Sequence, residues 1–239
     1  MKNALKLIAI MLFAWAMASC TKDPNNGGSG SYGRHEYVDL GLPSGTLWAT
    51  CNVGANNPED FGDYFAWGET SPKDDYSGDT YRYSIGWHSH FSSNLSTINS
   101  LTKYCNNSEC GYNGFTDTLT ILQPTDDAAT ANWGNGWRMP TVEECWELFH
   151  YCTLLCTTQN GVNGMRFTGP NGNTLFLPAA GYWYSDLDYA GSWGYYYSSA
   201  VNTDDPGDAK CIEFAYAGTG RPGNLSRYLG SPIRPVRSR

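Results

Sequence analysis

The residues best suited to molecular recognition are aromatic side chains near the end of the chain. Eleven of them stand between residues 181 and 228, among Gly, Ser, Asn and Asp: Tyr182, Trp183, Tyr184, Tyr189, Trp193, Tyr195, Tyr196, Tyr197, Phe214, Tyr216 and Tyr228. Rigid aromatic rings supply contact area at little entropic cost, and small polar residues between them supply adaptable hydrogen bonds. This composition predicts a surface that acts through non-covalent contacts.

We place this surface in residues 181–231 and expect a protein or a glycan as its ligand. From Phe214 onward the chain has five Arg residues and no acid, so its end is basic on an acidic protein. The candidate ligand-binding residues are Trp183, Tyr184, Asp188, Trp193, Tyr195, Tyr197, Lys210, Tyr216, Arg221, Asn224, Ser226 and Leu229. Along a predicted strand over residues 209–216, side chains at odd positions lie on one face and those at even positions on the other. The sequence does not indicate which face packs on the core.

Catalytic constellations are not evident, and we predict neither enzyme activity nor a cofactor. The histidines at positions 35, 88, 90 and 150 stand in no Ser-His-Asp context. Glu143 and Glu144 are adjacent at the start of a predicted helix, where the helix dipole accounts for them. His88 and His90 would supply two metal ligands only, which makes a poor site.

The cysteine spacing favours structural roles over metal binding. Besides Cys20 there are seven cysteines: Cys51, Cys105, Cys110, Cys145, Cys152, Cys156 and Cys211. An odd number in an exported protein leaves at least one free thiol. Cys105 and Cys110 are close enough to bridge a small loop. Cys145, Cys152 and Cys156 fall in one predicted helix as small hydrophobic residues, and without a C-x-x-C pair no metal site is predicted.

Composition and charge argue against nucleic-acid binding and against a disordered chain. The 239 residues carry a formal charge of −8, and loss of Lys2 and Lys6 with the first 19 residues would bring it near −10. A nucleic-acid-binding protein needs a basic footprint, so we expect no nucleic-acid partner. Charged residues are only 16% and aromatic residues reach 15%, which is too apolar for a disordered chain. The 27 Gly and 17 Tyr favour a fold of short strands and many loops.

The first twenty residues have the pattern of a bacterial lipoprotein signal. Two lysines precede an apolar run over residues 7–15, which is too short to span a bilayer, and small residues then lead directly to Cys20. We predict removal of residues 1–19 and lipidation of Cys20, whose acyl chains would anchor the protein to membrane lipid. An ordinary secretory signal, with Cys20 incidental, is the alternative.

The remaining chain divides into a tether and one folded domain. Residues 20–35 are rich in Gly and Asn without periodic apolar residues, and are expected to be flexible. Residues 36–239 are long enough to form a single domain with a sizeable core. Within it, residues 71–114 are polar and rich in Ser, Asn, Tyr and Gly, and we interpret them as an irregular insertion on the surface.

The predicted elements belong to an α+β domain with one or two helices. Thr141 and Glu144 have capping-box spacing, and Cys145, Leu148, Phe149 and Cys152 follow on one stripe, so a helix begins at Thr141. A shorter helix is predicted over residues 125–132 with Thr125 as its cap. Strands are predicted over residues 37–40, 46–53, 61–67, 165–167, 174–177, 194–199, 209–216 and 233–237, with the fourth and fifth forming a hairpin.

A series of motifs spread over residues 36–237 resembles the Fibrobacter succinogenes major paralogous domain family. The motifs are YVDLGL (37–42), LWATCNVGA (47–55), GDYFAWGET (62–70), DDAA (126–129), WG (133–134), WRMPT (137–141), LPAAG (177–181), GYYYSS (194–199) and RPVR (234–237). The resemblance implies a C-type-lectin-like fold, related to formylglycine-generating-enzyme folds, on an outer-membrane lipoprotein. Within the motifs we interpret Trp48, Trp67, Trp133 and Trp137 as core residues.

Two further expectations concern the same motifs and the end of the chain. Arg138 and Arg234 are expected to pair with buried acids such as Asp63, Glu69 or Asp127. Some relatives with this layout are variable proteins of diversity-generating retroelements, in which the last quarter is diversified and displayed on one face. That resemblance implies a near-copy of the 3′ coding end beside a reverse-transcriptase gene.

Three other functions stay open. A pilus or cell-envelope structural component fits the tether as well as a ligand-binding protein does. An enzyme related to formylglycine-generating folds would need a reactive cysteine pair, and Cys105 and Cys110 lie in the irregular insertion without a supporting base. Calcium-dependent lectins use Glu-Pro-Asn or Gln-Pro-Asp with Trp-Asn-Asp, and the sequences at 123–125 and 132–134 complete neither motif.

Overall fold

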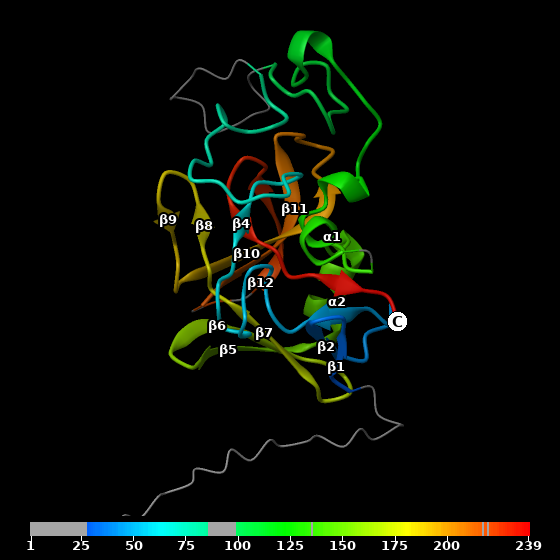
Figure 1. The fold of residues 1–239 in the computed structure, drawn as a ribbon, viewed down its shortest axis with the longest axis vertical. Helices are drawn as coiled ribbons and strands as arrows, with labels where there is room; N and C mark the ends of the chain where they lie inside the picture. The colour runs from blue at the N-terminus through cyan, green and yellow to red at the C-terminus, as the bar shows by residue number, and fades with distance from the viewer. Residues whose placement is uncertain (1–27, 86–98, 135, 217, 219) are drawn as a thin grey trace, which may run out of the picture.

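The computed structural model describes residues 28–85, 99–134, 136–216, 218 and 220–239 (Figure 1). These residues form a mostly-β domain with two α-helices, which is in keeping with the expected α+β class. The helices are α1 (Ala128–Trp133) and α2 (Val142–Tyr151), with 3₁₀ turns η2 (Tyr112–Gly114) and η3 (Pro124–Asp126). The strands are β1 (Gly30–Tyr32), β2 (His35–Asp39), β3 (Leu47–Ala49), β4 (Tyr64–Phe65), β5 (Thr153–Gln159), β6 (Val162–Thr168), β7 (Thr174–Pro178), β8 (Tyr182–Trp183), β9 (Leu187–Asp188), β10 (Trp193–Val201), β11 (Asp208–Ala215), β12 (Gly220–Ser226), β13 (Ser231–Pro232) and β14 (Val236–Arg237).

A four-stranded antiparallel sheet, in the order β1-β2-β3-β14, joins the two ends of the domain. Val38 and Val236 pair with Trp48 from opposite sides, so the last strand is held next to the first ones (Figure 1). The expected tether boundary at residue 35 is therefore wrong. Residues 30–32 already pair with β2, because Tyr32 packs against Trp137 and gives this Gly-rich segment an apolar contact.

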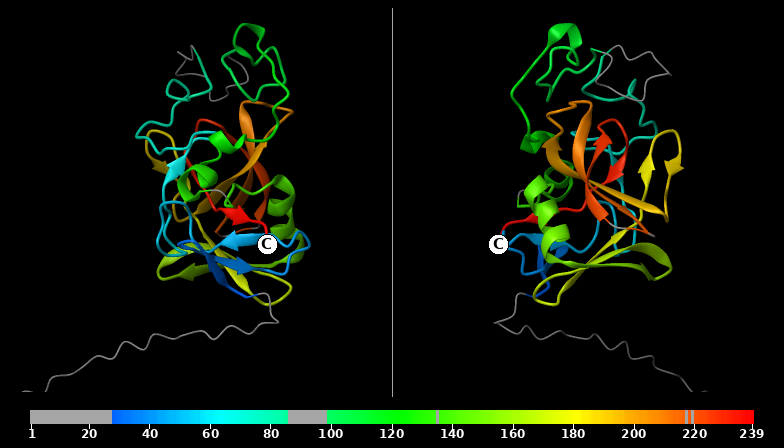
Figure 2. Two further views of the ribbon diagram at one scale, coloured as in Figure 1. Left: turned by 45° about the vertical axis from the view of Figure 1, so that its right-hand side comes forward. Right: turned by 180° about the vertical axis from the view of Figure 1, so that it is seen from behind.

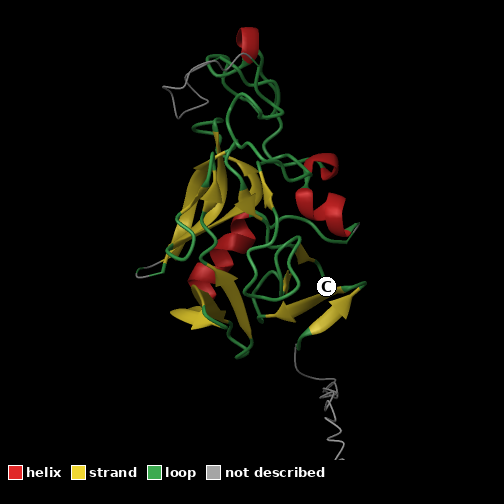
Figure 3. Ribbon diagram, turned by 60° about the vertical axis from the view of Figure 1, so that its left-hand side comes forward, coloured by secondary structure: helices red, strands yellow, loops and turns green. Residues whose placement is uncertain are grey.

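Helix α2 packs between two three-stranded sheets, β5-β6-β7 and β10-β11-β12 (Figure 3). Its buried residues Cys145 and Leu148 share one apolar cluster with Phe167 of β6 and with Ile212 and Phe214 of β11. Burial of this stripe stabilises the helix more than its intrinsic propensity does. The sheet β10-β11-β12 carries most of the candidate ligand-binding residues, and α2 covers one of its faces.

The predicted helix start at Thr141 is confirmed. The Thr141 hydroxyl accepts a hydrogen bond from the Glu144 amide at 3.2 Å, and the Glu144 carboxylate accepts one from the Thr141 amide at 2.8 Å. The helix ends at Tyr151, so the expectation that Cys156 shares it is wrong. Residues 153–159 contain three Thr and alternate in burial, and they form strand β5 instead.

The shorter predicted helix begins three residues later than expected and ends one residue later, at Trp133. Pro124–Asp126 form the turn η3, and α1 begins at Ala128. Its cap is Asp127, whose carboxylate accepts a hydrogen bond from the Thr130 amide at 2.9 Å, rather than Thr125. Asp127 also accepts from the Met139 amide at 2.8 Å, so one buried carboxylate links α1 to the segment that leads into α2.

The predicted insertion is irregular in its described parts, residues 71–85 and 99–114, but it is not only a surface segment. Tyr81, Tyr83 and Tyr104 are buried and pack edge-to-face with one another and with Trp67. The guanidinium of buried Arg227 lies over the rings of Trp67 and Tyr81. The insertion therefore has an aromatic core that is continuous with the domain.

Each predicted strand overlaps a strand of the structure, but several are shorter than predicted. The strand expected over 46–53 is only β3, that over 61–67 is only β4, and that over 233–237 is only β14. The hairpin formed by β6 and β7 is confirmed. Strand β12 was not predicted, because Gly220, Pro222 and Gly223 disfavour a strand, yet it pairs along its whole length with β11.

Arg138 pairs with a buried acid as expected, although not with one of the three named, whereas Arg234 pairs with no acid. Arg138 forms its ion pair with Glu144, at 2.6 Å between Nη2 and Oε1. Arg234 donates to the Asn52 side chain at 2.8 Å and to the Thr50 carbonyl at 2.7 Å, because its pocket is lined by backbone oxygens rather than by acids. Trp48, Trp67 and Trp137 are buried as expected, whereas Trp133 is half-buried. Burial lowers the pKa of Arg234 to about 10.

Candidate functional site

Four aromatic side chains form a connected row beside the β8–β9 hairpin. Tyr189 lies 5.6 Å from Tyr182, Tyr182 lies 5.5 Å from Tyr195, and Tyr195 lies 6.0 Å from Trp193 between ring centroids. The last two rings are nearly parallel, at 11°. We call these four residues the aromatic ladder. Tyr189 is 54% exposed and the other three are half-buried, so the ladder reaches the surface along its length.

Glycines allow the strands under the ladder to approach. Gly181 has φ +62°, and a Cβ there would come within 1.9 Å of the Asp188 carbonyl oxygen. A Cβ on Gly194 would meet the ring of Phe214 at 2.2 Å. Both positions therefore require glycine. The hairpin stands at the side of the β10-β11-β12 sheet, where the view from behind shows it in yellow (Figure 2).

An ion pair lies beside the ladder on the same face of the sheet. Strand register places Glu213 between Tyr195 and Arg221, and Arg221 lies 3.4 Å from the Glu213 carboxylate. Burial, with the Glu213 charge as a smaller cause, raises the pKa of Tyr195. Burial likewise raises the pKa of Tyr182. Both hydroxyls stay protonated at neutral pH and can donate as well as accept hydrogen bonds.

The hairpin carries three more of the predicted residues. Trp183 is half-buried against Tyr64, at 6.4 Å between ring centroids. Tyr184 is 41% exposed and lies 6.0 Å from Tyr228. Asp188 is half-buried and pairs with Tyr182 across the two strands. Trp183 alternates with Tyr182 along β8, so its ring contacts Tyr64 rather than the ladder, and Tyr184 contacts Tyr228.

Two of the predicted site residues are buried, and their assignment as displayed residues is wrong. Tyr197 is fully buried, and its hydroxyl donates to the carbonyls of Ser226 at 2.6 Å and Leu229 at 3.1 Å. Leu229 is 9% exposed and belongs to the same apolar cluster. Tyr197 is on the same face of β10 as Trp193 and Tyr195, but further along the strand loops cover that face and bury the Tyr197 side chain.

The predicted residues also do not share one face, because strand register divides them. Lys210, Asn224 and Ser226 lie on the face opposite Tyr195. Lys210 and Asn224 line a shallow cleft of about 240 Å³ next to Trp146 of α2. Tyr216 follows the end of β11, and its hydroxyl lies 3.2 Å from that of Thr158 in β5. Of the predicted residues, the structure therefore places Trp193, Tyr195 and Arg221 on one face of the sheet. Trp183, Tyr184 and Asp188 lie on the neighbouring hairpin.

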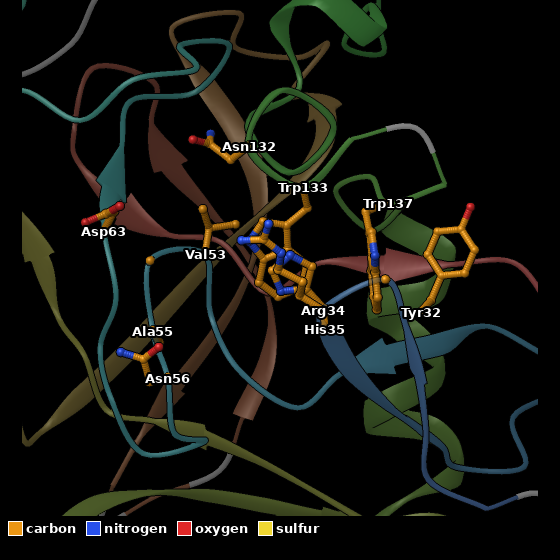
Figure 4. Close-up of a pocket in the computed structure, with 12 residues that line it drawn as sticks. Tyr32, Arg34, His35, Val53, Ala55, Asn56, Asp63, Asn132, Trp133 and Trp137 are labelled. Carbon is orange, nitrogen blue, oxygen red and sulfur yellow. The ribbon is translucent and has the colours of Figure 1, made fainter.

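A second site, which the sequence interpretation missed, is a cleft of about 590 Å³ near the start of the domain (Figure 4). The imidazole of His35 stacks on the indole of Trp133, with centroids 3.6 Å apart and planes at 4°. Trp137 stands edge-to-face to both rings. The cleft was missed because Tyr32, Arg34 and His35 were assigned to the tether. Aromatic residues inside a Gly-rich stretch were the signal that could have revealed it.

The opposite side of this cleft is polar. Asn56 and Asp63 come from the loops around β4, and Asn132 comes from α1 (Figure 4). Among the described residues, the side chains of Arg34, Asn56 and Asp63 make no hydrogen bond. The indole nitrogen of Trp137 is buried and has no partner within the described structure. Burial, with Arg34 as a smaller cause, lowers the pKa of His35, so its imidazole is neutral at pH 7.

The described ranges contain no group of three or more His, Cys, Asp or Glu side chains arranged for a metal ion. They contain no helix long and apolar enough to cross a membrane. No disulfide links the seven cysteines from Cys51 to Cys211, and the Cys105 thiol instead lies 3.1 Å from the Asn107 carbonyl. His88 and His90, which we considered as metal ligands and did not predict to form a site, lie outside the described residues.

Comparisons with family models, curated proteins and solved structures find no match to this chain.

Proposed function

We propose that the protein is a lipid-anchored surface protein that binds a protein ligand through the aromatic ladder and the β8–β9 hairpin. The ring contacts from Tyr189 to Trp193 are the observation that supports this most strongly. They hold four half-exposed aromatic side chains in one connected surface, whereas isolated exposed aromatic residues are ordinary. No chemical reaction and no cofactor belong to the proposal.

The chemistry of the ladder fits a protein ligand. Tyr, Trp and Arg are enriched at protein interfaces and carry most of the binding energy there. Here Tyr195 and Trp193 stand beside the exposed Arg221, and the Glu213 carboxylate holds Arg221 over the sheet. Because the hydroxyls of Tyr182 and Tyr195 remain protonated, each can bond a backbone amide or carbonyl of a partner. A glycan is the second class of ligand that the test below distinguishes.

We further propose a C-type-lectin-like scaffold, in line with the family resemblance of the motifs. Short strands, two helices and long irregular loops support that assignment without being specific to it. Diversification by a retroelement is part of the proposal only for exposed positions, since Tyr197 and Leu229 are buried. A near-copy of the 3′ coding end beside a reverse-transcriptase gene would support it, and its absence would remove it.

The test of ligand binding compares exposed aromatic residues inside and outside the ladder. The full chain would be screened on arrays of purified extracellular proteins and of glycans, and the Kd of each binder measured. Trp193→Ala or Tyr189→Ala is expected to weaken binding by about 2 kcal/mol, roughly thirtyfold, as for interface hot spots. Trp146→Ala is the matched control, because Trp146 is 53% exposed on α2. An equal loss of affinity in all three variants would contradict the proposal. Binding to glycans but to no protein would show that the ligand is a glycan.

The anchor has a separate test, because it lies in residues 1–27, outside the described structure. Metabolic labelling with a palmitate analogue is expected to mark the wild-type chain and not Cys20→Ser. Wild-type protein is expected in the outer-membrane fraction, and the variant in soluble fractions. Equal labelling of both chains would show that Cys20 is not the lipidated residue.

A further inference from the structure

We propose that the cleft between the His35–Trp133 stack and the Asn56–Asp63 loops binds a neutral saccharide, independently of the aromatic ladder. The cleft of about 590 Å³ lies within the range of small-ligand sites. It shares no residue with the ladder, and it is built from β1, β2, the loops around β4, and α1. The inference therefore does not depend on the proposed protein ligand.

The balance of charge in the cleft favours a neutral ligand. Arg34 is its one full cation and Asp63 its one carboxylate among the lining residues, and the lowered pKa of His35 leaves its ring uncharged at pH 7. A phosphorylated or otherwise polyanionic ligand would need several cations to replace its hydration. A polyamine would need several acids. Neither cluster lines the cleft.

The polar groups of the cleft match hydroxyl groups, which donate and accept at once. Asp63 supplies acceptors, Arg34 supplies donors, and the Asn56 amide supplies both, and none of these side chains is occupied by another described residue. Asn132 uses its amide nitrogen for the carbonyls of Thr70 and Ala128, at 3.0 and 2.8 Å, which leaves its oxygen as an acceptor. Several convergent groups of this kind can hold a ligand that carries several hydroxyls.

The aromatic side supplies the apolar part of such a site. A saccharide ring has C–H groups as well as hydroxyls, and the edges of the stacked His35 and Trp133 rings offer them apolar contact. Trp137 stands edge-to-face to both His35 and Trp133 and fixes the position of this aromatic wall.

The experiment titrates the full chain, extracted in a detergent without a sugar headgroup, with glucose, galactose, mannose and N-acetylglucosamine. Glycylglycine serves as a zwitterionic comparison. Isothermal calorimetry and tryptophan fluorescence would report binding, because Trp133 lines the cleft. At least one of the four sugars is expected to bind at millimolar concentration or below, and glycylglycine is not.

Variants locate the binding. Asp63→Ala and Asn56→Ala are each expected to raise the Kd of the bound sugar by about tenfold or more. Asp63→Asn, which keeps the shape of the side chain beside Gly54, is expected to weaken binding in the same direction and guards against misfolding. Trp193→Ala is expected to leave the Kd unchanged. Binding of none of the sugars, binding unchanged in the Asp63 and Asn56 variants, or loss of binding in Trp193→Ala would each overturn the proposal.

Discussion

The imidazole of His35 lies 3.6 Å from the indole of Trp133, with the two rings nearly parallel. Burial and the neighbouring Arg34 lower the pKa of His35 below its ordinary value of 6.5. The neutral ring is therefore the form that stacks in the cleft at pH 7. Because the unfolded chain binds a proton more readily than the folded one, this residue contributes stability that is present above about pH 6.5 and is lost as pH falls below it.

This arrangement predicts a pH-dependent tryptophan signal. A protonated imidazole quenches an adjacent indole, so the fluorescence of the wild-type chain should fall with a midpoint below pH 6.5. His35→Gln should remove that step. His150→Gln, on the exposed side of α2, should keep it. A midpoint above 6.5, or a step that survives His35→Gln, would contradict the stacking of a neutral His35.

Individual site residues could be predicted only where exposure follows from residue type. Trp193, Tyr195 and Tyr184 were identified from composition alone, and they reach the surface. Tyr197 lies in the same aromatic-rich segment as Tyr195 and on the same side of its strand. Its hydroxyl, however, donates hydrogen bonds to two backbone carbonyls, and loops cover its ring. Nothing in the sequence separates the two tyrosines, because the difference comes from loops far along the chain.

At the N-terminus of α2 one carboxylate serves both the helix and the rest of the domain. Glu144 accepts hydrogen bonds from the Thr141 amide, from Arg138 at 2.6 Å and from the Thr46 hydroxyl at 2.5 Å. Burial raises the pKa of this carboxyl, but these hydrogen bonds together outweigh burial and hold the pKa below its ordinary value of 4.5. Glu144 therefore contributes stability above that value which is lost as the pH falls through the folded-state pKa.

Glu144→Gln should lower the free energy of unfolding by about 2 kcal/mol at pH 7, because it weakens the capping box and leaves Arg138 without its partner. The difference between wild type and variant should shrink as the pH falls below 4.5, since the wild-type carboxylate is then protonated. Urea denaturation at several pH values measures this. Glu143→Gln, in the same turn, is the control. A difference that is independent of pH would contradict the assigned role.

Arg227 connects β12 to the irregular insertion. Its guanidinium is fully buried and donates to the Tyr81 hydroxyl at 2.9 Å, to the Pro206 carbonyl at 2.9 Å and to the Lys103 carbonyl at 3.0 Å. These bonds hold residues of the insertion against the sheet. Loss of the guanidinium would leave several buried acceptors unsatisfied.

Arg227→Met should destabilise the protein by about 3 kcal/mol or more, and should increase amide exchange first in residues 76–85 and 99–105. Arg221→Met is the matched control, because the Arg221 side chain is 74% exposed and its removal should change stability by less than about 0.5 kcal/mol. Hydrogen exchange followed by mass spectrometry measures both. Equal protection of the insertion in the two variants would contradict this coupling.

Elements were predictable where the local signal and the tertiary environment agree. Helix α2 combines a capping box with a continuous apolar stripe, and both survive in the structure. Strand β12 contains Gly220, Pro222 and Gly223, so its extended form depends on pairing with β11 rather than on its own residues. Strand β1 likewise depends on the contact between Tyr32 and Trp137, about a hundred residues away in the sequence.

On the scale of the whole molecule, both ends of the domain meet in one sheet. Arg237 of β14 lies over the ring of Tyr32 in β1, at 3.6 Å, and Arg239 pairs with Asp39 of β2. The sheet lies towards one end of the described structure, and the described parts of the insertion, residues 71–85 and 99–114, lie towards the other (Figure 1). A domain of short strands with one or two helices was predictable from periodicity and capping, whereas the division of the aromatic residues into core and surface required the assembled sheets.

The most direct test of the account is the ratio of ligand Kd values between Trp193→Ala and Trp146→Ala, measured on the full chain with the ligand found on the arrays. Both residues are tryptophans in contact with solvent, and they differ in whether the aromatic ladder includes them. We expect the Kd of Trp193→Ala to be about thirtyfold higher than that of wild type, and the Kd of Trp146→Ala to equal that of wild type. Equal Kd values for the two variants, with both folded, would contradict the claim that the ladder binds the ligand.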